Sequence, residues 1–439
     1  MKFYKRIGTA FIALAALALP ARATELNLWV MATTDSQQHD MQALLKPYLD
    51  RHPGLRINVT VLNWEAAWSK ITVAAVAGDG PDIIELGTTW VPSLAAMDVL
   101  EPVGADTLHD VGGATAFFPA LWGTTHPYND AHIYAVPWYG DARAAFYRTD
   151  VFKAAGVDPA EAFRNWDTFR AALQRINGMT VGGRKIAALG YPGKNDWNVV
   201  HNIMPWIWNA GGDVTSADYR HSAINSPASV AGVTYYANLA AQGLVPKSAL
   251  EQDSGQIESN FCNGDYAVIF SGPWLLKPLH TPKARGGFQE TVAAQNFSIA
   301  PYPAGPKGAY TFFSGSDLAV MKASRSKDAA WRVVAYLTGR DAEIQYTRMT
   351  SMMPARVDAA NAPELTADRD YRALLSAVHN GRHYVSIPSW GPLESVYVKG
   401  LGNVFDIVAG VKGAYAPAAV KHQLDLTANE ANDLMAQLQ

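Results

Sequence analysis

The chain has 439 residues, 49% hydrophobic and 17% charged, which excludes an intrinsically disordered protein and allows two or three domains with sizeable cores. Its 36 Lys and Arg and 39 Asp and Glu leave a formal net charge of −3, so no basic excess favours nucleic acid or an anionic membrane as a partner. The single cysteine, Cys262, excludes an intrachain disulfide and a zinc site built from several thiolates.

The first residues have the pattern of an export signal. Lys2, Lys5 and Arg6 give a positive start, and Ile7–Leu19 is an apolar run too short to span a bilayer comfortably. Ala21-Arg22-Ala23 then fits the small-residue cleavage site of such signals. We therefore expect residues 1–23 to be removed and the mature protein to be periplasmic; a retained membrane anchor is the alternative.

The segment after the signal predicts alternating strands and helices. Strands are predicted at Glu25–Val30, Arg56–Leu62 and Asp82–Leu86, from alternating or continuous apolar residues. Helices with one apolar stripe are predicted around Met41–Leu49 and over Glu65–Ala77. This order is typical of a parallel sheet with right-handed crossovers, whose ligands bind beyond the carboxyl ends of the strands.

The same patterns continue along the chain. Further strands are predicted at Ile133–Tyr139, Ala144–Arg148, Tyr266–Ser271, Phe297–Pro303 and Leu318–Met321. Further helices are predicted at Trp166–Ile176, Ala228–Gln242, Ser326–Thr338 and Asp341–Met349. The segment 204–212 mixes Pro, Trp and Gly and favours neither state.

Several motifs, in a fixed order from about Glu25 to Val357, together resemble one known family. They are Ile133–Pro137 (IYAVP), Phe146–Phe152 (FYRTDVF), Asn165-Trp166-Asp167, Phe261–Ala267 (FCNGDYA) with Gly272-Pro273-Trp274, Ser314–Met321 (SGSDLAVM) and Pro354-Ala355-Arg356. This series is similar to that of the extracellular solute-binding proteins of carbohydrate ATP-binding-cassette (ABC) importers, of the maltose- and trehalose-binding type. The sequence departs from the family at Gly87, where some relatives carry an acidic ligand.

The resemblance implies an α/β fold with two lobes, that of the periplasmic binding proteins. Each lobe would hold a parallel-rich sheet flanked by helices, and the hinge would consist of segments that cross between the lobes. By position we expect crossings near Pro137–Asp141, Pro303–Tyr310 and Thr350–Arg356. Lobe one would then comprise residues 24–138 and 309–349, and lobe two residues 139–308 and 350–439.

Sugar chemistry and the resemblance together suggest a set of ligand-binding residues. A pyranose presents an apolar C–H face, which an aromatic ring can cover, and a rim of hydroxyls, which carboxylates and Arg can bind. Trp274 follows a predicted strand in a Gly-Pro turn, from which its ring can project, and Arg356 matches a position that reaches the sugar in relatives. The other candidates lie at predicted strand ends, at the crossings or in the C-terminal part: Asp35, Trp64, Thr88, Trp90, Trp138, Tyr139, Asp141, Arg143, Ser316 and Trp390.

The alternative to ligand binding for these residues is a structural role in packing or at the surface. A Trp at a strand end often only fills the core, and Asp141 with Arg143 could be a solvated ion pair.

We expect a periplasmic protein that captures a di- or oligosaccharide, first an α-glucoside such as maltose or trehalose. It would act as a monomer, without a catalytic residue, metal or cofactor, and deliver the sugar to the membrane permease of an ABC importer. The main alternative is an exported glycoside hydrolase, which needs two carboxylates about 5–10 Å apart; Asp82, Glu85, Asp141 and Asp317 are available for that role. A binder of a non-sugar solute, such as a polyamine or iron, is a third possibility.

Overall fold

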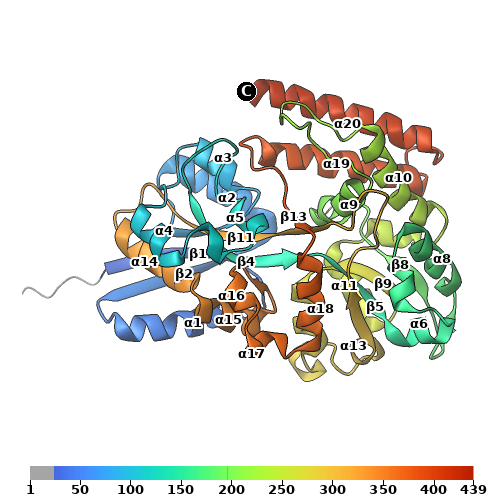
Figure 1. The fold of residues 1–439 in the computed structure, drawn as a ribbon, viewed down its shortest axis with the longest axis horizontal. Helices are drawn as coiled ribbons and strands as arrows, with labels where there is room; N and C mark the ends of the chain where they lie inside the picture. The colour runs from blue at the N-terminus through green and yellow to red at the C-terminus, as the bar shows by residue number, and fades with distance from the viewer. Residues whose placement is uncertain (1–23, 195, 439) are drawn as a thin grey trace, which may run out of the picture.

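The computed structural model describes residues 24–194 and 196–438, so the predicted export signal lies outside the described residues. The described residues form two lobes that lie side by side, as predicted, with the chain passing between them more than once (Figure 1). Within these residues, none of the helices combines the length and the apolar character needed to cross a bilayer.

Lobe one is built around a seven-stranded sheet of order β12–β4–β11–β3–β1–β2, with β13 paired to β11. Its strands are β1 (Thr24–Met31), β2 (Leu55–Leu62), β3 (Ile83–Gly87), β4 (Ala135–Ala142), β11 (Thr311–Val320), β12 (Met353–Pro354) and β13 (Gly381–Arg382). The parallel pairs β1–β2 and β1–β3 are those that the strand–helix alternation predicts. Strand β11 runs antiparallel to both β3 and β4, because it returns from the other lobe instead of following a crossover helix, and the sheet is therefore mixed.

Helices cover this sheet on both sides (Figure 1). They are α1 (Gln37–Arg51), α2 (Trp64–Ala77), α3 (Val91–Ala96), α4 (Ala105–Val111), α5 (Pro119–Trp122), α14 (Lys327–Leu337), α15 (Arg340–Thr350), α16 (Val357–Ala360) and α17 (Pro363–Thr366). In α1 the predicted stripe of Met41, Leu44 and Leu45 is buried in the core, which is what holds this helix to the lobe.

Lobe two holds a four-stranded sheet of order β10–β5–β9–β8. Its strands are β5 (Ala144–Arg148), β8 (Ala187–Gly190), β9 (Tyr266–Ser271) and β10 (Phe297–Ala300), and β6 (Thr180–Val181) pairs separately with β7 (Arg184–Lys185). Only β8–β9 is parallel, while β5 runs antiparallel to β9 and β10, so this sheet is less parallel than predicted. Its helices are α6 (Thr149–Ala155), α7 (Pro159–Ala162), α8 (Trp166–Ile176), α9 (Asn198–Asn209), α10 (Pro227–Ala241), α11 (Ser254–Asn263), α12 (Leu276–His280) and α13 (Val292–Gln295).

The C-terminal part adds α18 (Arg369–Val378), α19 (Trp390–Ala409) and α20 (Pro417–Leu438). Helices α19 and α20 lie along the outside of lobe two, drawn in red in Figure 1, and α19 packs on α9, α10 and α20. The beginning of α19 reaches lobe one, where the Ser93 hydroxyl donates to the carbonyl of Pro388 at 2.7 Å. This terminal segment therefore contacts both lobes.

The strands place the lobe boundaries differently from the predicted ones. Strand β4 pairs with β11 as far as Ala142, so the chain leaves lobe one at Arg143 and not near residues 137–141. Strand β12 pairs with β4, which places Met353–Pro354 in lobe one rather than lobe two. Strand pairing decides to which sheet a segment belongs, and this pairing joins residues far apart in the sequence.

Two elements differ from the sequence patterns. The predicted strand Leu318–Met321 is the end of the longer β11. The first residues of β11 pair with β13 and β4, and its polar middle, Ser314–Asp317, shows no apolar pattern although it is mostly buried. The unassigned segment 204–212 forms most of the second half of α9, although Pro205 lies inside that helix.

Strand β11 carries a buried acid. The side chain of Asp317 is fully buried, its Oδ2 accepts from the Thr124 hydroxyl at 3.1 Å, and its Oδ1 has no hydrogen-bond partner among the described residues. Burial raises the pKa of Asp317 to about 8, and the bond from Thr124 opposes this shift. The neutral acid is therefore the form that the fold prefers.

We predict that Asp317→Asn becomes increasingly more stable than the wild type as the pH rises. An aspartate in the unfolded chain ionises near pH 4, so the buried acid weakens the fold between about pH 4 and pH 8, by at most ~1.4 kcal/mol per pH unit. Urea denaturation of both proteins at several pH values measures the difference. The exposed Asp79→Asn is the control and should show no such trend. A pH-independent difference for Asp317→Asn would contradict this prediction.

Candidate ligand-binding site

The passage of the chain between the lobes fixes Arg143. Its backbone N–H donates to the carbonyl of Phe312 at 3.0 Å, and its carbonyl accepts from the Thr311 hydroxyl at 2.5 Å. Both partners are in β11, so the backbone of Arg143 is held between β4 and β5. Its side chain is only 4% exposed, which is unusual for an arginine and means that the guanidinium lies inside the protein.

Arg143 brings Asp141 and Trp274 together. Its guanidinium carbon lies 4.4 Å from the centroid of the Trp274 ring, a cation–π contact, and its Nε lies 3.3 Å from Oδ1 of Asp141. Burial raises the pKa of Asp141, and the neighbouring Arg143 charge opposes that shift. The ring of Trp274 is only partly buried, so a flat apolar surface stands beside a charged pair.

Glycine and glutamate orient the Trp274 ring. Strand β9 ends at Ser271, and a Cβ at Gly272 would lie 2.0 Å from the Trp274 ring, so only glycine lets the ring fold back here. The indole N–H donates to Oε1 of Glu258 in α11 at 2.8 Å, and the Ser271 hydroxyl donates to the same oxygen at 2.6 Å. Burial raises the pKa of Glu258, against the hydrogen bonds from Ser271 and Trp274.

A second group of side chains lies around His201 of α9. The His201 ring stacks on Phe312 at 4.5 Å between centroids, and its Nδ1 lies 2.6 Å from the Tyr384 hydroxyl. Tyr384 in turn stacks on Trp390 at 4.5 Å. Burial, with a smaller effect from the Arg143 charge, holds the pKa of His201 well below its usual value, so the ring is neutral.

Glu394 of α19 belongs to the same group and contacts lobe one. Its Oε1 lies 3.9 Å from Nε2 of His201 and has no hydrogen-bond partner in the part of the chain that the structure describes. Burial raises its pKa to about 8, against a hydrogen bond with Thr89 of lobe one. We call Asp141, Arg143, His201, Glu258, Trp274, Tyr384 and Glu394 the interlobe cluster.

Tryptophans of lobe one lie next to the start of α19. Trp90 lies 5.5 Å from Trp64 and 5.6 Å from Trp68, measured between ring centroids. A Cβ at Gly87 would lie 3.3 Å from the Trp64 ring, and a Cβ at Gly391 of α19 would lie 3.5 Å from that of Trp68. The contact at Gly87 is tight and the one at Gly391 is an ordinary van der Waals distance, so these partly exposed rings lie against the backbone of both β3 and α19.

Tyr139 and Ser316 belong to a buried network behind this surface. The Ser316 hydroxyl donates to the Tyr139 hydroxyl at 2.9 Å, and the Tyr139 hydroxyl donates to Oε1 of Glu85 at 2.6 Å. Burial raises the pKa of Glu85 to about 7, against hydrogen bonds from Tyr139 and the backbone N–H of Met31. Thr88 is buried close by, and its hydroxyl is hydrogen-bonded to Ser314.

The remaining candidates lie apart from the interlobe cluster or are enclosed. Asp35 is exposed in the loop after β1. Arg356 is engaged within lobe one, bonded to Asp358 at 2.9 Å and to the carbonyl of Val111 at 2.8 Å. Trp138 stacks on Tyr346 at 4.5 Å between centroids, and both Trp138 and Trp390 are fully buried in this conformation.

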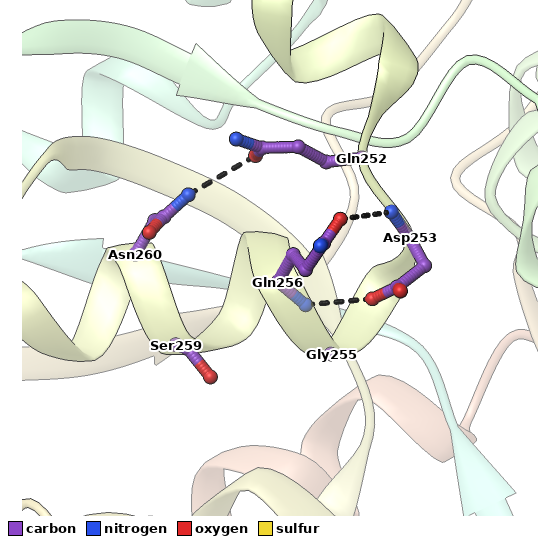
Figure 2. A pocket seen from close by; sticks show the side chains of 6 residues that line it. All are labelled: Gln252, Asp253, Gly255, Gln256, Ser259 and Asn260. Carbon is purple, nitrogen blue, oxygen red and sulfur yellow. Dashed lines mark hydrogen bonds between the residues drawn. The ribbon is translucent and has the colours of Figure 1, made fainter.

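Two hollows accompany these residues. One, of about 370 Å³, lies between Pro119–Ala120 of lobe one and Asp213, Thr215 and Tyr219 of lobe two, and Gly381–Val385 line it as well. The other, of about 460 Å³, lies beside α11 and is lined by Gln252, Asp253, Gly255, Gln256, Ser259 and Asn260 (Figure 2). There the Gln256 side chain accepts from the backbone N–H of Asp253, the Asp253 side chain accepts from the backbone N–H of Gln256, and the Asn260 amide donates to Oε1 of Gln252, so these four residues bond within the group.

The carboxylates available to a hydrolase have structural partners. Glu85 and Asp317 are fully buried in the sheet of lobe one. Asp82 accepts from the backbone N–H of Asn27 at 2.9 Å and from the Ser324 hydroxyl at 2.5 Å, and Asp141 is paired with Arg143. These contacts do not favour an acid–base pair around a scissile bond.

The sequence reasoning did not single out Glu258, His201, Tyr384 or Glu394. Glu258 sits on the polar side of α11, four residues before the Cys262 of a recognised motif, and spacing alone gives it no partner. His201 carries one usable signal, a titratable residue inside a mostly apolar helix, whereas Glu394 shares its helix with Lys399 and Asp406 and does not stand out.

Comparison with known proteins supports one assignment. A diacetylchitobiose-binding protein, DasA, of Streptomyces coelicolor is 22% identical over 390 residues, which cover 84% of this chain and 82% of that protein. A mannitol-binding protein of Pseudomonas aeruginosa is 25% identical over 341 residues, covering 75% of this chain and 73% of that protein. The structure of maltose-bound MalE3 of T. maritima superimposes with a TM-score of 0.79 at 20% identity, over 94% of this chain and all of that one, which shows a common two-lobed fold. Residues 34–344 match the bacterial extracellular solute-binding proteins, and the chain belongs to that family.

Proposed function

We propose that this protein captures a di- or oligosaccharide between its two lobes, first an α-glucoside such as maltose or trehalose, and delivers it to the permease of an ABC importer. It would act in the periplasm as a monomer after removal of residues 1–23, without a metal or cofactor. The observation that carries the proposal is the contact of Trp274, Arg143 and Asp141 at the crossing between the lobes.

This group of side chains has the chemistry that a sugar needs. The partly exposed ring of Trp274 offers a flat apolar face for the C–H side of a pyranose. The charges of Asp141 and Arg143 suit the hydroxyl rim, because hydrogen bonds to charged groups are the stronger ones. Asp141 Oδ1 and Arg143 Nε lie 3.3 Å apart as an ion pair but make no hydrogen bond to any described residue, so both retain hydrogen-bonding capacity for ligand hydroxyls.

The relatives support a carbohydrate or a polyol as the ligand. Those named above bind diacetylchitobiose, mannitol or maltose, so the family covers both single units and disaccharides. We favour a di- or oligosaccharide because aromatic side chains stand on both lobes: Trp64 and Trp90 on lobe one, Trp274 on lobe two.

Binding would do no chemistry but would change the relative positions of the lobes. A ligand that touches both lobes only when they are closed stabilises the closed state by its extra contacts there. The hydrogen bond from Ser93 to Pro388 and the contact of Thr89 with Glu394 are lobe-to-lobe interactions that opening would break.

Trp274→Ala should weaken sugar binding with little effect on folding. Loss of the stacking surface is expected to cost about 2–4 kcal/mol, or roughly 30- to 1000-fold in Kd, as for a binding hot spot. Isothermal titration with maltose, followed by other sugars and mannitol, measures the affinity, and thermal melting measures stability. Trp29→Ala is the control, because Trp29 lies in β1 beside Lys70 and should leave Kd unchanged.

Normal affinity with a much lower melting temperature for Trp274→Ala would make Trp274 a core residue and count against the proposed site. Incubation of the same sugars with the wild-type protein tests the hydrolase alternative. Release of shorter sugars by the wild type would establish that alternative instead.

A second prediction concerns the shape of the molecule in solution. If the ligand draws the lobes together, the radius of gyration from X-ray scattering should fall when a bound sugar is added at saturation. An unchanged radius would mean that the free protein is already closed and would argue against ligand-driven closure.

A further inference from the structure

Glu394 is unusual among the acids of the interlobe cluster because, within the described residues, it has neither a paired cation nor two hydrogen-bond donors. It belongs to α19, which packs on lobe two, yet its side chain reaches Thr89 of lobe one. Only 3% of the side chain is exposed, and Oε1 makes no hydrogen bond within residues 24–194 and 196–438. By comparison, Asp141 is paired with Arg143, and Glu258 accepts two hydrogen bonds.

The groups that face Glu394 come from three elements. Thr89 approaches from lobe one, His201 from α9 with its Nε2 at 3.9 Å, and Tyr384 from the segment before α19. Arg143, itself paired with Asp141, lies close enough for its charge to disfavour protonation of His201. The positive charge of Arg143 is therefore paired with Asp141. Glu394 and His201 remain as a buried pair of titratable groups.

We propose that closing the two lobes takes up a proton at the Glu394–His201 pair, so that the protein binds its ligand more tightly at neutral than at alkaline pH. This inference rests on the proposed closure around a sugar. With the lobes apart, water reaches the pair at the seam and Glu394 is an ordinary glutamate. With the lobes in contact, Glu394 is buried and an unneutralised negative charge there would be costly.

Burial shifts the pKa values of Glu394 and His201 in opposite directions, and the two values together set the pH range of proton uptake. In the closed protein the pair holds one proton, because burial raises the pKa of Glu394 to about 8 and lowers the pKa of His201 well below its usual value. In an open, hydrated protein the pair holds one proton between about pH 4.5 and 6.5, on His201, and none above that range. Closure is thus neutral in protons between about pH 4.5 and 6.5 and takes up one proton between about pH 6.5 and 8.

The affinity for maltose, as the probe, should follow this proton balance. The Kd should be nearly constant from about pH 5 to 6.5 and then rise by up to about tenfold per pH unit to about pH 8. Titration calorimetry at pH ~7.5 in buffers of different ionisation enthalpy should give an uptake of roughly 0.7 proton per maltose bound.

Two variants separate the contributions. Glu394→Gln keeps the shape of the side chain but carries no titrating charge, so the rise in Kd above about pH 6.5 and the proton uptake should disappear. His201→Gln should extend the rise in Kd over the whole range from about pH 4.5 to 8, because only Glu394 then titrates. Glu161→Gln, an exposed acid on α7, is the control and should behave as the wild type.

Zero proton uptake by the wild type, or the same uptake in Glu394→Gln, would overturn the inference. If Glu394→Gln does not fold, a flat profile for His201→Gln above pH ~6.5 would overturn it as well.

If neither maltose nor any other sugar of the panel binds, the proposed function fails, and the protonation of Glu394 is decided on the free protein. There the melting temperature of Glu394→Gln relative to the wild type should increase from pH ~5 to ~8, since a buried acid with a raised pKa weakens the fold as the pH rises. A constant difference would then reject the inference.

Discussion

The antiparallel pairing of β4 with β11 is the constraint on which the arrangement of the lobes and of the interlobe cluster depends. It continues to the last residue of lobe one, where the backbone of Arg143 bonds to Phe312 and Thr311 on the neighbouring strand. Hydrogen bonds hold the backbone N–H and the carbonyl of Arg143, so its backbone is fixed. From this position the guanidinium lies over the Trp274 ring. The same pair of strands aligns Tyr139 with Ser316 in the network of Glu85, so one ladder organises the crossing and the buried surface behind it.

Burial has different consequences for the acids of this protein. Asp141 lies beside a guanidinium, and Glu258 receives hydrogen bonds from an indole and a hydroxyl. Glu394 has a neutral imidazole as its neighbour, and Asp317 has a single hydroxyl donor. Since a buried charge is tolerated only where cations or several donors surround it, the first two can ionise inside the protein more readily than the last two. The interlobe cluster therefore combines two acids that have a cation or several donors beside them with one acid, Glu394, whose neighbour is a neutral imidazole.

Local patterns predicted much of the architecture. The strand–helix alternation of residues 25–86 yields the parallel core of lobe one, and Gly272-Pro273-Trp274 marks the turn that presents an indole. Patterns were less informative for β11, because its buried middle is polar and its Ser314 and Ser316 hydroxyls bond to Thr88 and Tyr139. The candidate list likewise included Asp141, Arg143 and Trp274, which contact each other, as well as Trp138 and Arg356, whose partners lie within lobe one.

The order of strands and helices in residues 25–86 and the residue types suited to a sugar can be predicted from the chain alone, because periodicity and turn residues are local properties, and the two-lobed fold was predicted through the family resemblance of the motifs. Where the chain leaves each lobe, and which side chains meet there, depends on tertiary packing. Glu258, His201 and Glu394 are distant in sequence from Arg143, and their proximity follows from helices packing on a sheet and from the return of α19 to lobe one. Their charge states, too, arise only from this packing, because burial shifts a pKa by removing water that no sequence pattern reveals.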